Sequence, residues 1–304
     1  MINREKIIDL KGVTKRFGDK IVVDHVDMQI YKGEIVGFLG PNGSGKTTTM
    51  RMICGLLKAD EGEGTCLGYQ FDKIDFAIKK KIGYMTQKFS LYEDLSIRQN
   101  LEFVARVYQL DDIQKVTDNT LERLGLQHRQ HQLTGELSGG WKQRLALASS
   151  IIHEPELLLL DEPTAGVDPK ARRDFWDQIH ELAHQGLTVL VSTHYMDEAE
   201  RCHRIAYILY GKMMEMGTIS EVIERANLHT WIVEGNQLKN LTSQLKNLKG
   251  ADYISYFGNL LHVTGRNRET LENSLQKLNH DLYKIYPSQT TLEDVFISYM
   301  ETSK

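Results

Sequence analysis

The sequence predicts an α/β protein in which helices cover both faces of a parallel sheet. Three continuously apolar runs indicate this fold class: LLLLD from Leu157, TVLVST from Thr188 and RIAYILY from Arg204. Strands of a parallel sheet are buried on both faces, so they read as uninterrupted apolar segments. Helical segments alternate with such runs as far as about Gly217, which is the order that builds an α/β core.

Length, charge and cysteine usage limit what the chain can be. Its 304 residues are enough for two domains, and the net charge of −4 gives no basic footprint for nucleic acid. Cys54, Cys66 and Cys202 form no CxxC pair, which argues against a zinc site or disulfide framework and favours a reducing compartment. Without a signal-like start or a run of about 18 apolar residues, we expect neither secretion by that route nor insertion into a bilayer.

The first elements are short strands that lead into a glycine-rich loop. Apolar or alternating segments from Ile7, Ile21 and Glu34 predict three strands. The third runs directly into the glycines that begin at Gly40, and a helical pattern follows over residues 46–57. The order at this point is therefore strand, loop, helix.

Between residues 87 and 153 the strand signal disappears. Segments 97–110, 112–126 and 141–152 carry apolar residues at three- and four-residue spacing, which predicts three consecutive helices. Asp111 is the expected cap of the second helix, because a carboxylate is favoured at a helix N-terminus. We therefore expect a helical subdomain at about 88–153, within a first domain that covers residues 1–217.

The remaining residues, 218–304, predict a small α+β domain. Strands are expected from His229, Asp252, Leu260 and Leu282, and helices over residues 237–248 and 268–279. The order strand, helix, strand, strand, helix, strand matches a split βαβ unit.

The glycine-rich loop has the pattern of a phosphate cradle. Gly40, Gly45, Lys46 and Thr47 fit G-x-x-x-x-G-K-[ST], and a chance glycine-rich loop is disfavoured by the flanking strand and helix. Small residues let backbone amides point at phosphate oxygens, while the lysine neutralises charge and the threonine hydroxyl holds magnesium. The predicted nucleotide contacts are Gly40, Pro41, Asn42, Gly43, Ser44, Gly45, Lys46, Thr47 and Thr48.

Two carboxylates end the apolar run that starts at Leu157. Ligands bind at the C-terminal ends of strands in open α/β sheets, so Asp161 and Glu162 are expected beside the nucleotide. Asp161 suits the magnesium shell, and Glu162 suits polarising the attacking water. The alternative is a buried strand that ends in a solvated acidic turn, which loses weight once the cradle is granted.

His194 and Gln87 each follow an apolar strand and are expected at the same edge of the sheet. A single histidine is more often a surface or core residue, and an isolated glutamine indicates nothing. Their place beside the cradle makes His194 a candidate catalytic residue. It also lets the Gln87 amide reach a magnesium ligand or the water.

The stretch ELSGGWKQR, residues 136–144, places a serine and two glycines directly before a helical pattern. A helix N-terminus offers free amides and the positive end of the dipole, so Ser138, Gly139 and Gly140 predict a second anion site. This site lies in the helical insertion, too far along one monomer to be expected at that monomer's own γ-phosphate.

Together these motifs resemble the ATP-binding cassette of ABC transporters over residues 1 to about 217. The phosphate loop (40–47), glutamine loop (Gln87), LSGG signature (137–140), acidic strand (157–162), D-loop (Asp168) and switch histidine (His194) occur in the family's order. LYEDLSIRQNL, PTAGVDP, THYMDEAE and the ending TLEDVFISYM are similar to cassettes of multidrug and daunorubicin-resistance exporters. The expected fold is thus a P-loop NTPase core with a mixed sheet, a helical subdomain and a C-terminal α+β domain.

The resemblance implies an ATPase that works as a homodimer. In the family two cassettes pair head to tail, so each ATP lies between the cradle of one chain and the signature of the other. It implies catalytic roles for Glu162, His194, Gln87 and Lys46, and Mg²⁺ contacts by Thr47, Gln87 and Asp161. Asp168 and Phe17 become further nucleotide contacts, Phe17 by stacking on adenine.

The resemblance also implies an integral membrane permease as partner. The chain itself is then expected on the cytoplasmic face of the membrane, peripheral and not inserted, with no nucleic acid bound. The C-terminal domain is expected to regulate, to stabilise the dimer or to bind the permease, and the sequence does not choose between these roles.

One position departs from the family pattern. Many cassettes have glutamine after LSGG, but this chain has Trp141. The indole is expected to pack in the dimer seam, and packing on ribose or in the helical core are the alternatives.

Two other functions fit parts of the sequence. A soluble cassette ATPase acting on nucleic acid or ribosomes is disfavoured because it usually has two cassettes, a long coiled coil or zinc cysteines. A nucleotide-dependent regulator that does not hydrolyse ATP is disfavoured by the intact Glu162 and His194.

Overall fold

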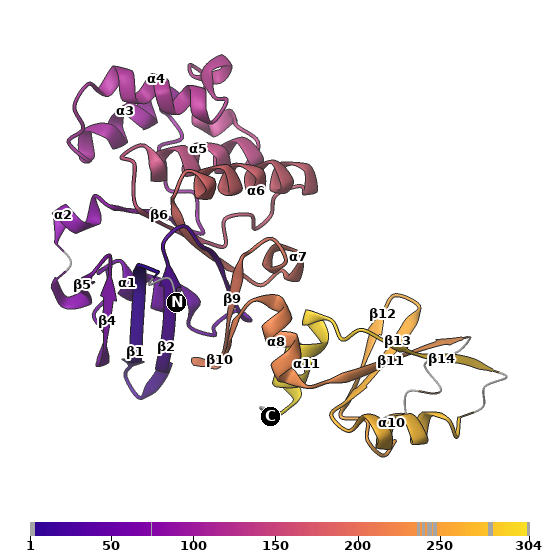
Figure 1. Ribbon diagram of the computed structural model, residues 1–304. Coiled ribbons are helices and arrows are strands. Elements are labelled where there is room, and N and C mark those ends of the chain that lie inside the picture. The colour runs from indigo at the N-terminus through magenta and orange to yellow at the C-terminus, as the bar shows by residue number, and fades with distance from the viewer. Residues whose placement is uncertain are drawn as a thin grey trace. The chain divides into compact units, whose positions relative to one another are not determined.

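The computed structural model describes residues 4–73, 75–235, 238, 241, 245, 248–278 and 282–302. The chain divides into two units, Met1–Met216 and Gly217–Lys304 (Figure 1). No helix in the described part of the chain combines the length and the apolar character that crossing a bilayer requires.

A six-stranded sheet forms the centre of the first unit. Its strands are β3 (Ile35–Leu39), β6 (Ile82–Met85), β7 (Leu157–Asp161), β8 (Thr188–Thr193), β9 (Arg204–Leu209) and β10 (Lys212–Gly217). They lie in the order β10-β9-β3-β8-β7-β6, and the neighbours from β9 to β6 run parallel. β3, β7 and β8 are buried along their whole length, so the prediction of parallel strands covered on both faces is confirmed.

A second sheet of the same unit is antiparallel. It consists of β1 (Lys6–Phe17), β2 (Lys20–Tyr31), β4 (Glu61–Cys66) and β5 (Tyr69–Gln70), in the order β2-β1-β4-β5. β1 and β2 are the strands expected from Ile7 and Ile21. β4 and β5 were not predicted, because EGEGTC is polar and glycine-rich and lacks the apolar alternation of a strand.

Among the described residues the first unit has helices at the four predicted ranges, with differences at their ends, and three further helices that were not predicted individually. They are α1 (Lys46–Ile53), α2 (Phe76–Lys79), α3 (Ile97–Val107), α4 (Ile113–Arg123), α5 (Gly139–Ile151), α6 (Pro169–His184) and α7 (Met196–Ala199). α1 ends four residues earlier than expected, because Gly55 adopts φ 65° after the cap at Cys54. The cap of α4 is Asp112 and not Asp111, since the Asp112 side chain accepts from the Lys115 N–H at 3.3 Å.

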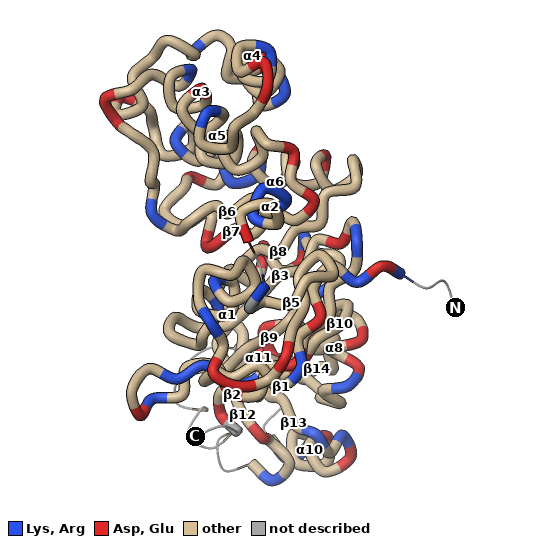
Figure 2. Tube along the Cα trace, turned by 90° about the vertical axis from the view of Figure 1, so that its left-hand side faces the viewer, with Lys and Arg blue, Asp and Glu red and all other residues tan. Residues whose placement is uncertain are grey.

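Successive residues of the parallel strands pack into two different cores. In β7, Leu158 and Leu160 pack with the helices α3 to α6, whereas Leu157 and Leu159 pack with α1 and the antiparallel sheet. This alternation follows from the two-residue period of a strand. α3, α4 and α5 lie side by side in both views of the molecule (Figures 1 and 2).

The second unit is a four-stranded antiparallel sheet with helices. Its elements are α8 (Ile219–Ala226), β11 (His229–Gly235), β12 (Tyr253–Phe257), β13 (Leu260–Gly265), α10 (Arg268–Leu275), β14 (Tyr283–Ser288) and α11 (Leu292–Thr302). The sheet order β12-β13-β11-β14 inserts β13 between β11 and β12, as in a split βαβ unit. The helix expected at 237–248 lies mostly outside the described residues, and α8 and α11 were not predicted.

Candidate functional site

The loop between β3 and α1 has a backbone that only glycine can adopt at two positions. Gly40 has φ 157°, and a Cβ there would lie 2.2 Å from the Ile208 carbonyl oxygen. Gly45 has φ 103°, and its Cβ would lie 2.6 Å from the Val22 carbonyl oxygen. Between them the Ser44 hydroxyl is buried without a hydrogen-bond partner in the described residues, which suits a ligand with acceptor oxygens.

Lys46, the first residue of α1, points back into this loop. Its ammonium donates to the Gly40 carbonyl at 2.7 Å and to the Pro41 carbonyl at 3.2 Å. Burial lowers the pKa of Lys46 from its usual value, and the negative charges of Glu162 and Asp161 oppose that shift. The ammonium therefore sits among acceptors at the end of the loop, as the phosphate cradle predicts.

Asp161 ends β7 and collects hydroxyl groups from three elements. The Thr47 hydroxyl donates to its Oδ1 at 3.1 Å, and the Ser192 hydroxyl donates to the same oxygen at 2.6 Å. The Tyr84 phenol donates to Oδ2 at 3.5 Å. Burial, and then the charge of Asp161, raise the pKa of Tyr84 to about 12, so the phenol stays protonated. This set of oxygen atoms has the chemistry that Mg²⁺ prefers.

Glu162 follows at the end of the same strand in a left-handed backbone conformation, with φ 47°. Such a conformation costs a residue other than glycine about 1–3 kcal/mol and persists where the surroundings fix it. Here the Glu162 N–H donates to the Ser192 hydroxyl at 2.9 Å and to the Ser192 carbonyl at 3.1 Å. The strained backbone aims the Glu162 side chain at the end of the sheet.

Three of the predicted site residues surround the Glu162 carboxylate. Gln87 Nε2 donates to Oε2 at 3.0 Å, His194 Nδ1 lies 3.6 Å from Oε2, and Lys46 Nζ lies 3.7 Å from Oε1. His194 Nδ1 is buried and makes no hydrogen bond within the described residues. The structure thus brings Gln87, Glu162, His194 and the cradle together at one sheet edge.

The signature lies beside a different part of the chain. Ser138 caps α5 by its backbone only, and its hydroxyl makes no cap hydrogen bond. With Gly140 it lines a hollow of about 250 Å³ that also contains Asp168 and the start of α6. Within the described residues, no hydrogen bond or ion pair joins Ser138, Gly139 or Gly140 to the cradle. Ser138 and Gly139 are exposed to solvent in one chain.

The segment after Gln87 fixes the position of the signature. Asn100 of α3 is fully buried, and its amide nitrogen donates to the Tyr92 carbonyl at 2.9 Å and to the Thr134 hydroxyl at 3.0 Å. Lys142 of α5 pairs with Glu93 at 2.6 Å. These bonds join residues 92–95 to the chain that leads into Ser138.

Trp141, Phe17 and Asp168 have definite surroundings. Trp141 packs against the helical core, with the guanidinium carbons of Arg129 and Arg144 at 4.7 and 4.9 Å from its ring centre, and it also lines the hollow beside Ser138, so its place in a dimer seam stays a prediction. Phe17 is 51% exposed at the end of β1 and leaves ring area free for stacking. Asp168 caps α6, accepting from the Lys170 and Ala171 N–H groups at 3.1 and 3.0 Å.

Sequence reasoning missed Ser192 and Tyr84. Ser192 pairs with Asp161 in the β7–β8 register, so its hydroxyl meets that carboxylate. The polar Ser192–Thr193 pair at the end of an otherwise apolar strand was the available signal. Nothing in the sequence distinguishes Tyr84 from an aromatic core residue.

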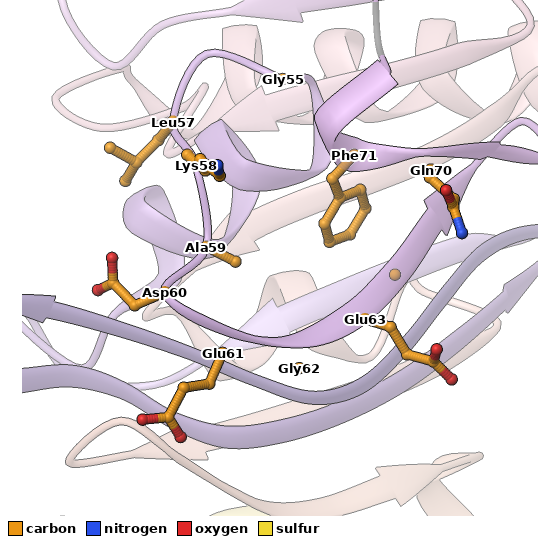
Figure 3. A pocket seen from close by; sticks show the side chains of 11 residues that line it. Gly55, Leu57, Lys58, Ala59, Asp60, Glu61, Gly62, Glu63, Gln70 and Phe71 are labelled. Atoms are coloured by element: carbon orange, nitrogen blue, oxygen red, sulfur yellow. The ribbon is translucent and has the colours of Figure 1, made fainter.

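A separate hollow of about 530 Å³ lies between the end of α1 and β4 (Figure 3). Figure 3 shows the Phe71 ring pointing into it, and this ring packs over Gly64, where a Cβ would collide with it at 2.3 Å. The carboxylates of Asp60, Glu61 and Glu63 are each paired with a lysine or arginine of β1. This hollow contains none of the predicted site residues.

The chain is similar to known proteins of one family. The family model for ABC transporters matches residues 23–165. The chain is 39% identical over 220 residues to the Nod factor export ATP-binding protein I of Rhizobium sp. (strain N33), covering 71% of this chain and 72% of that protein. The chain belongs to the ATP-binding proteins of ABC transporters.

Other relatives extend this assignment of the cassette. This chain is 46% identical over 217 residues to the probable multidrug ABC transporter ATP-binding protein YbhF of Escherichia coli (strain K12). The match covers 70% of this chain and 37% of that protein. A dimeric ATP-binding cassette solved in a post-hydrolysis state with ADP and Pi is 29% identical with a TM-score of 0.63, covering 69% of this chain and 98% of that one. The predicted family and its α/β fold are confirmed.

Proposed function

We propose that the chain is the ATP-hydrolysing subunit of an ABC exporter. The observation that carries the proposal is the convergence of Lys46, Gln87 and His194 on the Glu162 carboxylate, next to a loop built for phosphate. A nucleotide site needs the loop alone, whereas the additional groups around Glu162 suit a reaction at the γ-phosphate.

The cradle binds the triphosphate of ATP. The loop amides, the buried Ser44 hydroxyl and the Lys46 ammonium supply donors and positive charge, and Phe17 stacks on the base. Thr47, Asp161 and Gln87 are the residues that would hold Mg²⁺, and the ion would supply neutralisation of the phosphate charge.

Glu162 polarises the attacking water. Its carboxylate is acceptor-only when ionised, and the Gln87 amide occupies one of its oxygens at 3.0 Å. His194 has a buried Nδ1 that makes no hydrogen bond within the described residues and lies 3.6 Å from the same carboxylate, so the ring is placed to contact the transferring phosphate. Removing such a base usually lowers the rate about 10²- to 10⁴-fold.

The reaction centre is completed by a second copy of the chain. Ser138 and Gly139 are exposed, and the Ser138 hydroxyl makes no cap hydrogen bond, which leaves the positive end of α5 for the γ-phosphate bound by the partner. An isologous pair then holds two ATP molecules, and a dimeric relative bound to ADP and Pi supports this arrangement.

The membrane partner of this ATPase chain is an integral membrane permease, which the chain contacts at the cytoplasmic face of the membrane. Tyr92 and Phe103 form an exposed ring pair with centroids 5.2 Å apart in the segment that follows Gln87, and exposed apolar groups of this kind mark contact surfaces. Relatives named for multidrug transport and Nod factor export support export as the direction.

Neither alternative function gains support from a specific observation. Basic and acidic residues are interspersed along the described trace, where a nucleic-acid groove would show a basic stripe (Figure 2). The reactive arrangement at Glu162 would be superfluous in a regulator that only binds nucleotide.

Replacing Glu162 tests hydrolysis directly. Glu162→Gln keeps the shape of the side chain, and its amide oxygen can still accept from the Gln87 amide. The substituted amide is, however, too weakly basic to activate water. We expect ATP binding to persist, steady hydrolysis to fall at least about 10²-fold and a dimer to accumulate with ATP. Phosphate release, nucleotide binding and sedimentation measure the three outcomes, and a variant that hydrolyses ATP normally would remove Glu162 from the mechanism.

A further inference from the structure

A buried carboxylate lies behind the proposed site and has no role in it so far. Glu198, in the short helix α7, is 1% exposed. The Thr193 hydroxyl donates to its Oε2 at 2.6 Å, and the Thr164 hydroxyl donates to its Oε1. The nitrogen Nε of Arg172 lies 3.6 Å from Oε1. Both carboxylate oxygens are therefore engaged, and a cation compensates the buried charge.

Each partner of Glu198 adjoins a residue of the proposed site. Thr193 ends β8 and directly precedes His194, and its hydroxyl also accepts from the Tyr195 N–H at 3.0 Å. Thr164 lies in the turn that starts at Glu162. Arg172 is in the first turn of α6, the helix that Asp168 caps. One carboxylate thus joins the turn after Glu162, the helix after Asp168 and the strand end before His194.

We propose that Glu198 is a positioning residue for ATP hydrolysis, holding the turn from Glu162 to Asp168 in register with His194. The inference rests on the proposed function. A buried carboxylate needs its desolvation offset, and a well-packed apolar residue would stabilise this place equally well. What an apolar residue would lack is a two-pronged acceptor, which fixes two hydroxyls from different segments at one distance.

The Glu198 carboxylate also connects the turn that contains Thr164 to His194. Displacement of the Thr164 segment pulls on the Glu198 carboxylate and hence on Thr193, the residue before His194. Binding of a second protomer against Asp168 and the signature is therefore felt at His194 within the same chain. This coupling depends on both hydroxyl bonds and on nothing that touches ATP.

Glu198→Gln tests the proposal in the full-length chain. The amide keeps the shape but accepts through one oxygen only, so one of the two hydroxyls loses its acceptor. We expect kcat for ATP hydrolysis to fall about 10- to 100-fold, the range for groups that orient a reacting residue, with KM for ATP changed less than about twofold because the cradle is untouched. Glu200→Gln is the matched control, because it makes the same glutamate-to-glutamine change at an exposed residue of the same segment.

Thr193 gives a second variant that keeps Glu198 itself. Thr193→Val removes the hydroxyl without changing the shape and should reproduce the loss in kcat, whereas Thr193→Ser retains the hydroxyl and should restore it. Combining Thr193→Val with Glu198→Gln should cost less than the sum of the two single losses, because both changes disrupt the same link from Thr164 through Glu198 to Thr193.

The outcomes separate this inference from the proposed function. If the wild-type chain does not hydrolyse ATP, the proposed function itself is wrong. If the wild type hydrolyses ATP but Glu198→Gln behaves as Glu200→Gln does, the positioning role is wrong. Equal activities of Thr193→Val and Thr193→Ser, or fully additive losses in the double variant, would overturn it as well, even if Glu198→Gln folds poorly.

Discussion

The partly buried histidine His153 has a neutral imidazole ring. His153, in the turn after α5, stacks on Tyr108 with ring centres 3.8 Å apart and places Nε2 3.2 Å from the Ile82 carbonyl. Its Nδ1 is buried and unpartnered within the described residues. Burial lowers the pKa of His153 to about 4, so the folded protein holds the ring neutral.

Because the folded protein holds His153 neutral, we expect the free energy of unfolding to decrease in acid. The unfolded chain binds a proton at His153 below about pH 6.5, whereas the folded chain does so only near pH 4. The stabilising contribution is complete above about pH 6.5 and falls by about 3 kcal/mol as the pH drops from 6.5 to 4. His153→Phe keeps a ring on Tyr108 and removes the titration. We expect the variant to melt slightly below the wild type at pH 8 and to lose less stability at pH 5.

Thermal or urea unfolding at both pH values measures this difference. His128→Gln is the control, because His128 is exposed and carries none of these contacts. Parallel stability curves for wild type and His153→Phe between pH 8 and pH 5 would contradict the assignment.

At this scale the sequence predicted chemistry better than geometry. Lys46, Thr47, Asp161 and Glu162 follow from motif spacing, because each motif states which atoms a nucleotide needs. The left-handed backbone at Glu162 and the hydroxyl of Ser192 depend on how β7 pairs with β8, and a pairing register between distant segments is not written in either segment alone.

Among the elements, α3 leaves an apolar face uncovered. Phe103 and Val107 are one turn apart, 40% and 52% exposed, and Tyr92 meets the Phe103 ring edge-on. Most apolar helix faces in this unit are buried in the two cores. An uncovered one next to the segment after Gln87 is where a permease is expected to dock.

A negative charge introduced on this face of α3 should weaken membrane association without lowering the ATPase rate. Phe103→Asp places a carboxylate where a partner would have to desolvate it, so we expect the chain to leave the membrane fraction of the source cells. The ATPase rate of the purified chain should change by less than about twofold, because the substitution touches no site residue. Fractionation with immunoblotting and phosphate release measure the two quantities.

Tyr69→Asp is the control for this experiment, since Tyr69 is 46% exposed on β5. Membrane association that is equally strong for Phe103→Asp and Tyr69→Asp would place the permease contact elsewhere.

Elements with a strong period were predicted, and those without one were missed. The buried strands and the three helices of the insertion follow from apolar spacing, and the split βαβ order follows from the order of the elements. β4 was missed because glycine and glutamate alternate there, and its strand state depends on pairing with β1. The shift of the α4 cap from Asp111 to Asp112 is a choice between adjacent aspartates that only the backbone decides.

For the whole molecule, the proposed division of the site between two protomers makes the sharpest prediction. One chain assembles the cradle, Glu162 and His194, and within the described residues no hydrogen bond or ion pair joins Ser138 of that chain to the cradle. If each ATP needs both halves, a defect in one half can be covered only by the other half of a different protomer.

Mixing two inactive variants tests this division. Lys46→Ala destroys the cradle but keeps the signature, and Ser138→Arg blocks the signature but keeps the cradle. Their heterodimer has one site with the intact cradle of the second chain and the intact signature of the first, whereas the other site is doubly defective. We expect each variant alone to be silent and the mixture to hydrolyse ATP, with up to about half of the chains in heterodimers if the two associate equally.

Lys46→Ala mixed with Asp161→Asn is the matched control, since both variants are defective in the cradle half and neither can complete a site for the other. That mixture should stay silent at every ratio. A Lys46→Ala and Ser138→Arg mixture that is equally silent would mean that Ser138 serves the cradle of its own chain or none, whereas rescue that rises with the product of the two concentrations ties turnover to the encounter of two different protomers.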